Sequence, residues 1–207
     1  MAIKMGPETA SGKTEVYITD AISHHMNLRH HYTTAIRHGK WAFSVMLKNH
    51  LMAIKMGPVT EVQILSADSQ YTSFHQAKTA IPINSTDQGE WAFEVMRNDD
   101  LMVIKKGPET ESGRTEVQIL SASSGYKLFS VTTTATGLPL TDSRHGEWAF
   151  VLMFNNDLMA IERKQEMGEM WGMRTNLLIL SASSKYASLS AENTKAWRSD
   201  DRFDIQP

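Results

Sequence analysis

Short segments that alternate apolar with small or polar residues recur along this chain, and polar stretches separate them. Residues 91–96, WAFEVM, alternate in this way, whereas LMVIK at 101–105 is apolar on both faces. TEVQIL at 115–120 alternates again, and YKLFSVTTTA at 126–135 is rich in aromatic residues, threonine and valine. Because a strand points successive side chains to opposite faces and favours such residues, the pattern predicts four strands of about five to seven residues.

The stretches between these segments have the composition of turns. RNDD at 97–100, GPETESG at 107–113 and SASSG at 121–125 combine glycine, proline, asparagine, aspartate and serine. These residues favour tight turns because they tolerate unusual backbone angles or hydrogen-bond their own backbone. A helical interpretation is open only for 23–32, where it is weakly supported. The remaining pattern therefore predicts antiparallel strands joined by turns.

The four-segment pattern is repeated. GEWAF occurs at 89–93 and 146–150, and GKWAF occurs at 39–43. Trp91 follows Trp41 by 50 residues, and Trp148 follows Trp91 by 57. The chain also opens with MAIKMGPET, which corresponds to the second segment of a unit. A period of this size is typical of propeller blades and similar β-repeats.

The repeats predict an all-β fold, a four-bladed β-propeller-like ring of four-stranded antiparallel blades in a single domain, 1–207. Such units bury both faces of their sheets only by stacking on one another. Since the chain begins at a second strand, the segment 200–205 is the candidate to close the first blade. With fewer than four WAF strands, an open array or a homodimer that completes the ring stays an alternative. The predicted units are about 1–38, 39–88, 89–145 and 146–207.

Composition narrows the function classes. The formal net charge of −2 provides no field that attracts nucleic acid. Apolar runs such as LMAI and LLIL are far shorter than the roughly 20 residues of a membrane-spanning helix, so we expect no membrane insertion. The chain has no cysteine, which excludes disulfides, thiolate zinc sites and thiol catalysis. No signal peptide is recognisable in this numbering, and a secreted or a cytoplasmic location stays open.

The string IKKGPETESGRTEVQILSASSGYKLF at 104–129, preceded by WAFEVMRNDDLM, resembles the FG-GAP-like or VCBS-type propeller repeats. This resemblance covers most of the chain and implies a fungal or microbial lectin-like protein. Members often carry an acidic calcium loop between the first two strands. Here that place holds only 48–50, 97–100 and 155–157, with too few carboxylates for the six to eight oxygen ligands of calcium. We therefore expect no metal and no cofactor at these loops.

Catalysis is not expected. The chain lacks a nucleophile elbow, a zinc-protease helix motif, a P-loop and a dinucleotide fingerprint. Its carboxylates fall mainly at repeat-equivalent positions, such as Glu15, Glu61 and Glu116. A residue that every repeat needs is usually structural, whereas a catalytic residue is needed once. The sequence therefore predicts a protein that is not an enzyme.

The turns between the first and second strands are candidate carbohydrate contacts. Amide and carboxylate groups can satisfy paired hydroxyls, while an aromatic ring stacks on the apolar face of a sugar. Several weak equivalent sites would give avidity, so a lectin or agglutinin that binds glycans or glycoproteins is the favoured function. A purely structural role for the same residues, in turns and in packing, is the alternative. The candidate residues are Asn49, Trp91, Asn98, Asp99, Trp148, Asn155 and Asn156.

Histidines cluster in the first unit and suggest a competing function. HHMNLRHH at 24–31 and nearby His38 contain five of the eight histidines. Neutral imidazole binds zinc, copper, nickel and iron, so a metal- or haem-binding, hemopexin-like propeller that uses His24–His38 is the alternative. Adjacent histidines on a strand point to opposite faces, which limits each pair to one ligand per side. An exposed basic loop, and a protein-interaction scaffold, also stay open.

Overall fold

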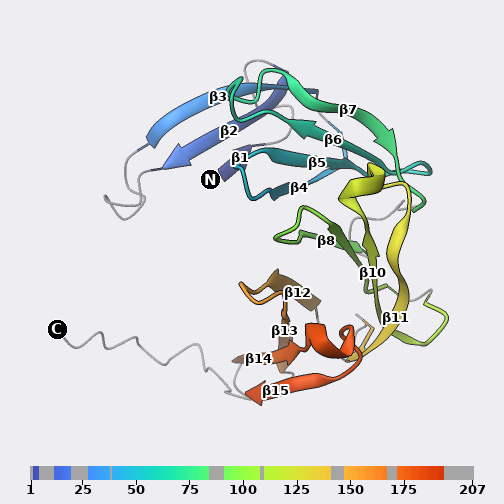
Figure 1. Cartoon of the computed structure of the whole chain (residues 1–207). Helices are drawn as coiled ribbons and strands as arrows, with labels where there is room; N and C mark the ends of the chain where they lie inside the picture. Colours follow the sequence, from blue (N-terminus) through green and yellow to red (C-terminus); the bar gives the residue numbers. More distant parts are fainter. Residues whose placement is uncertain are drawn as a thin grey trace. The chain divides into compact units, whose positions relative to one another are not determined.

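The structure is a computed structural model that describes residues 2–4, 12–19, 28–37, 39–83, 91–107, 110–140, 147–166 and 172–193. Within these ranges the regular structure consists of β-strands and two short 3-10 turns, η2 (Ala122–Ser124) and η3 (Ala182–Ser184). The strands form four separate sheets in which neighbours are antiparallel (Figure 1). In every sheet the strands follow one another in chain order, because each turn returns the chain beside the strand it has just left.

The sheets group into two compact units, Met1–Gln88 with Ala122–Leu128 and Gly89–Ser121 with Phe129–Pro207. The first unit contains a sheet of three described strands and a sheet of four. The three-stranded sheet consists of β1 (Ala2–Lys4), β2 (Lys13–Thr19) and β3 (Leu28–Arg37). The four-stranded sheet consists of β4 (Trp41–Val45), β5 (Leu51–Lys55), β6 (Glu61–Leu65) and β7 (Phe74–Ala80).

The second unit contains two sheets of four strands. One consists of β8 (Trp91–Val95), β9 (Leu101–Lys105), β10 (Arg114–Leu120) and β11 (Phe129–Pro139). The other consists of β12 (Glu147–Leu152), β13 (Leu158–Glu166), β14 (Gly172–Leu180) and β15 (Leu189–Asn193). The predicted all-β fold of antiparallel, propeller-type blades is thus confirmed. The helical alternative for 23–32 is wrong over 28–32, which lie in β3. The closing strand expected at 200–205 lies outside the described residues.

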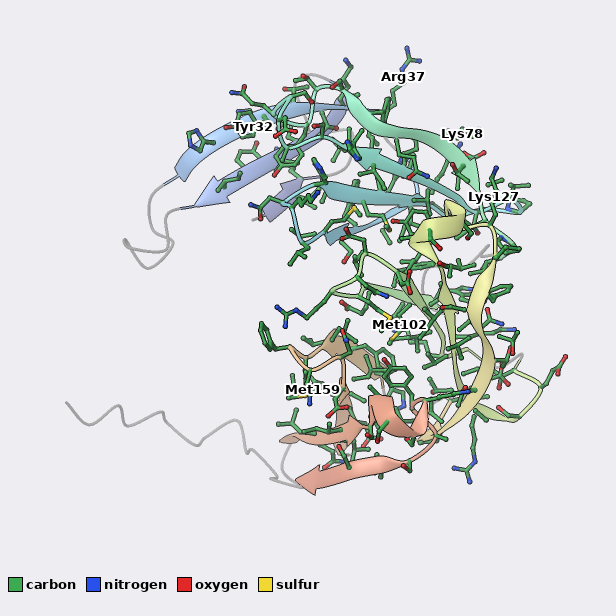
Figure 2. All side chains as sticks on the ribbon, in the orientation of Figure 1. Tyr32, Arg37, Lys78, Met102, Lys127 and Met159 are labelled. Atoms are coloured by element: carbon green, nitrogen blue, oxygen red, sulfur yellow. The ribbon has the colours of Figure 1, made fainter. Side chains whose placement is uncertain are left out.

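The repeated tryptophan and phenylalanine pack one sheet of a unit on the sheet before it. In the first unit Trp41 belongs to a core cluster with Val16 of β2 and Ile36 of β3. In the second unit Trp148 and Phe150 share a cluster with Met102 of β9, which Figure 2 labels. Alternation along the strand places the two aromatic rings on the same face. In the strands that contain Trp41 and Trp148, the WAF motif thus covers the apolar face of the preceding sheet of the same unit.

A second repeated feature is a cross-strand pair of polar residues. Lys4 lies opposite Glu15, Lys55 opposite Glu61, and Lys105 opposite Glu116. In the last sheet both residues change, so that Glu162 lies opposite Asn176 and accepts a hydrogen bond of 2.6 Å from its side-chain nitrogen. Opposite residues on adjacent strands have their Cβ atoms about 4.5–5.5 Å apart, so this position selects complementary groups.

The repeated glutamates have local partners as well. The Glu15 carboxylate accepts a hydrogen bond of 2.7 Å from the Tyr17 hydroxyl, and Glu116 accepts one of the same length from the hydroxyl of Ser112. Glu61 forms an ion pair with Lys78, a residue of β7 labelled in Figure 2. These carboxylates hold strands and loops together, in accord with their place in every repeat.

Candidate functional site: the turns between first and second strands

The three turns 46–50, 96–100 and 153–157 share one backbone conformation. In each, the first residue donates a hydrogen bond of 2.8–2.9 Å to the carbonyl of the last and accepts one of 2.9–3.0 Å from the fourth. The fourth residue has a positive φ, 60° for Asn49, 64° for Asp99 and 66° for Asn156. Among residues other than glycine, asparagine and aspartate tolerate this left-handed region best. Backbone geometry therefore explains why these three positions hold Asn or Asp.

Two of the turns also have a side-chain hydrogen bond of their own. The amide of Asn98 donates to the Asp100 carboxylate at 2.8 Å, and its oxygen accepts from the Asp100 backbone at 3.3 Å. Asn155 makes the same pair of bonds with Asp157, at 2.7 and 3.1 Å. A side-chain amide has two N–H groups and two lone pairs on its oxygen. Each of these exposed amides thus retains one donor and one acceptor for a ligand.

A buried tyrosine from the loop after the third strand supports the turns. The Tyr71 hydroxyl donates to the carbonyl of Asn49, and the Tyr186 hydroxyl donates to that of Asn156, both at 3.0 Å. Tyr126 is the corresponding residue of the loop after β10 in the sequence and is equally buried. All three tyrosines have a positive φ of 63–70°. Burial raises the pKa of Tyr71, and burial followed by the charge of Asp157 raises that of Tyr186 to about 12.

The last residue of the turn makes a further contact with that loop. An oxygen of Asp157 accepts a hydrogen bond of 2.8 Å from the Ala182 backbone. In the first unit His50 replaces the aspartate, and its Nδ1 accepts from the Ala67 backbone at 3.0 Å. The His50 ring also stacks on His75, with centroids 4.5 Å apart. The two side chains differ in chemistry, yet each accepts a hydrogen bond from the equivalent backbone N–H, that of Ala182 or of Ala67.

The turn tips of the second unit are joined by a cation–π contact. The guanidinium carbon of Arg97 lies 3.4 Å from the centroid of the Phe154 ring, and the Nη1 of Arg97 donates a hydrogen bond of 3.3 Å to the Phe154 carbonyl. Phe154 is nonetheless 80% exposed. Since a guanidinium covers only one face of a ring, the other face and the edge remain in solvent. Arg97, Asn98, Phe154 and Asn155 together form a continuous feature, which we call the turn-tip surface.

Only some of the residues predicted from the sequence belong to the turn-tip surface. Asn98 and Asn155 reach the turn-tip surface, and Asp99 and Asn156 follow them in the same turns. Asn49 belongs to the first unit. In that turn Leu47 takes the place of Arg97 and Phe154, and Lys48 takes the place of the exposed amide. Arg97 and Phe154 were missed. The sequence marks them only by variation. The second position of the turn is Leu47, Arg97 or Phe154, whereas the three positions after it are polar in every repeat.

The two predicted tryptophans are not equivalent. Trp148 is 1% exposed and belongs to the core of the second unit, so its ring does not reach a surface where a sugar could stack. Its Nε1 is buried and has no hydrogen-bond partner among the described residues. Trp91 is half-buried, and the ammonium group of Lys105 lies 5.7 Å from its ring centroid. The aromatic ring that is open to solvent at the turns is that of Phe154.

Searches against known protein families, curated proteins and solved structures found no match to this chain. The resemblance to FG-GAP or VCBS repeats therefore stays a prediction. The described residues contain no helix long and apolar enough to cross a membrane.

Glu94 is a carboxyl that occurs once among the repeats, where Ser44 and Val151 hold the equivalent positions. It shares a strand face with Ala92 and Met96, which pack against the core of the second unit. Burial raises its pKa to about 7. No hydrogen bond or ion pair to another described residue compensates the charged form. Glu94 is therefore a titrating group inside the second unit, away from the turn tips.

The two described histidines of β3 stack on neighbouring tyrosine rings. His30 stacks on Tyr32 with centroids 5.6 Å apart, and His31 stacks on Tyr17 at 4.5 Å. His31 also lies 3.5 Å from the Glu15 carboxylate. Among the residues that the structure describes, no three of the His, Asp and Glu side chains gather in a metal-binding arrangement. His24, His25 and His38 of the predicted metal or haem cluster lie outside the described residues.

Proposed function

We propose that this protein is a non-enzymatic carbohydrate-binding protein, a lectin, whose contact region includes the turn-tip surface. The observation that carries the proposal is the exposed Phe154 ring, held by Arg97 and flanked by the exposed amides of Asn98 and Asn155. An exposed aromatic ring offers a stacking platform, and the amides that flank it have unused hydrogen-bonding groups.

The chemistry of a pyranose suits this surface. One face of such a ring carries several C–H groups, which pack on an aromatic face, while its hydroxyls point outward and both donate and accept hydrogen bonds. Asn98 and Asn155 each have one N–H and one oxygen lone pair to offer, as their internal bonds use the others. The turn hydrogen bonds hold both amides in place, which lowers the entropy lost when a ligand binds.

All four residues of the turn-tip surface are exposed, so water competes with a ligand for each of them and we expect a single site to bind weakly. Display of several sugars on one glycan or glycoprotein converts weak sites into useful avidity. The turn of the first unit has Leu47 at its tip and no equivalent exposed amide, and we assign it a lesser role. The repeated carboxylates have structural partners, which accords with the absence of catalysis in this proposal.

A glycan-array screen of the purified protein, with and without EDTA, tests the proposal. We expect binding to a defined sugar class that survives EDTA and is lost in Phe154→Ala. Leu47→Ala is the matched control, because Leu47 occupies the same turn position and is 63% exposed. Absence of binding to every glycan, or equal binding by Phe154→Ala and the wild type, contradicts the proposal. Loss of binding in EDTA would contradict the expectation that the acidic loops hold no calcium.

A further inference from the structure

The last sheet of the second unit has an apolar face that is incompletely buried. Met159 of β13 lies opposite Val151 of β12 on one side and Ile179 of β14 on the other. Ile161, two positions after Met159, lies opposite Leu177. Opposite residues on paired strands share a face, and so do residues two positions apart along a strand. Val151 is 44% exposed and the other four are half-buried, and we call these five residues the last-sheet face (Met159 is labelled in Figure 2).

The equivalent face of the other sheet in this unit is buried. The residues at the matching positions of β9 and β10 are at most 5% exposed and are Met102, Ile104, Val117 and Ile119. They share a core cluster with Trp148 and Phe150, the two rings of the following strand β12. A face of nearly the same composition is thus covered by aromatic rings in one sheet of this unit and remains partly exposed to solvent in the other.

The order of the sequence indicates which ring covers which face. Trp41 follows the end of β3 by four positions and shares a core cluster with Val16 of that sheet. Trp148 follows the end of β11 by nine positions and shares a cluster with Met102 of that sheet. In both cases the ring belongs to the first tryptophan after the last strand of the sheet. The first tryptophan after β15 is Trp197, which follows that strand by four positions and lies outside the described residues.

We propose that Trp197 packs on the last-sheet face and covers it as the WAF strands cover the sheets before them. The chain needs only four positions after β3 to bring Trp41 onto its sheet, so the same spacing after β15 gives sufficient reach. Contact removes apolar surface of the indole and of the sheet from water, which favours the packed state. Ser199 stands where a phenylalanine follows Trp41 and Trp148 by two positions, so the contact involves one aromatic ring. The inference concerns packing and does not depend on the proposed function.

NMR of the methionine methyl groups tests this assignment, because an aromatic ring shifts the signal of a methyl group that packs on its face. The full chain is labelled with ¹³C at these methyl groups, and Met159→Leu identifies the Met159 signal. Trp197→Ala should move that signal towards the position of a solvent-exposed methionine and increase its broadening by a soluble nitroxide. Trp197→Phe, which keeps a smaller ring, should move the signal less, so the test does not depend on one variant.

Arg198→Ala is the matched control, because the next side chain of an extended segment points to the opposite side. The methyl signal of Met102, which shares its cluster with Trp148, is the internal control and should not respond to Trp197→Ala. An unchanged Met159 signal in Trp197→Ala overturns the inference, and so does an equal shift in Arg198→Ala.

A second copy of the chain is the competing occupant of the last-sheet face. Sedimentation velocity over a range of protein concentrations detects it, and the Met159 signal is recorded over the same range. We expect that signal to be independent of concentration. A dimer whose dissociation on dilution shifts the Met159 signal would assign the face to the second copy and overturn the inference.

Discussion

The hydroxyl of Tyr186 donates a hydrogen bond of 3.0 Å to the backbone carbonyl of Asn156, and thereby joins two loops of one sheet. Tyr71 and Asn49 repeat the relationship in the first unit at the same distance. Each pair unites two residues in the left-handed region of backbone space. In both turns, the repeated backbone geometry thus involves a tyrosine side chain 22 or 30 residues further along the chain.

Tyr186→Phe should lower the free energy of unfolding by about 1–2 kcal/mol, because it removes the hydroxyl that donates a hydrogen bond to the Asn156 carbonyl. Chemical denaturation followed by tryptophan fluorescence measures the change. Tyr17→Phe is the control, since its hydroxyl lies nearer the surface and bonds a carboxylate that has another neighbour. Unchanged stability in Tyr186→Phe would show that the hydrogen bond contributes nothing to the fold.

Glu94→Gln should remove a pH dependence of stability. Burial raises the Glu94 pKa from 4.5 to about 7, so the folded state holds its proton more tightly than the unfolded state. The stabilisation is complete below pH 4.5 and is lost as pH rises to about 7. Above that pH the variant should be more stable than the wild type by an amount on the order of 2 kcal/mol.

Denaturation of both proteins at pH 5 and pH 8 measures this effect. The difference between the two proteins should be small at the lower pH and large at the higher. Glu111→Gln, on an exposed loop, is the control for the loss of one carboxylate. A difference that is constant across the two pH values would mean that Glu94 ionises alike in the folded and unfolded states.

His50 should be replaceable by aspartate but not by alanine. His50→Ala leaves the Ala67 N–H without its acceptor and opens space beside His75, at a cost of about 1–3 kcal/mol. His50→Asp restores the acceptor in the form that Asp157 uses at the equivalent turn. Thermal unfolding at neutral pH should rank the aspartate variant well above the alanine variant. Equal melting temperatures would exclude the acceptor role.

Trp148→Ala and Phe154→Ala should have opposite consequences. The first empties a core position that is 1% exposed, and such truncations typically cost about 3–5 kcal/mol. The second removes a ring that is 80% exposed and should barely change stability while it abolishes sugar binding. Unfolding curves and binding assays on the two variants provide the comparison. A Trp148→Ala protein that is stable but binds sugar poorly would show that Trp148 belongs to the sugar site.

The sequence predicts the strands and their turns well because both have local signals. Alternation of apolar residues and the Asn and Asp positions mark the elements from 91 to 135. β8, β9 and β10 lie within this range, whereas β11 begins at Phe129 and extends beyond it to Pro139. The Arg97–Phe154 contact joins residues 57 positions apart, and neither repeats its counterpart in the other units. A search for repeated residues therefore overlooks them. The prediction that Trp148 contacts a sugar failed for a related reason. The WAF pattern shows that the Trp and Phe rings share one face of the strand, but not that another sheet of the unit covers that face.

The side-chain amide signals of Asn98 and Asn155 test the central claim most directly. The protein, labelled with ¹⁵N, is titrated with the sugar that the array identifies, and two-dimensional NMR follows the side-chain NH₂ groups. We predict that both signals shift in a saturable manner while that of Asn49 shifts little, and that Phe154→Ala abolishes the shifts. Saturable shifts confined to other parts of the chain would contradict the assignment of the sugar site to the turn-tip surface.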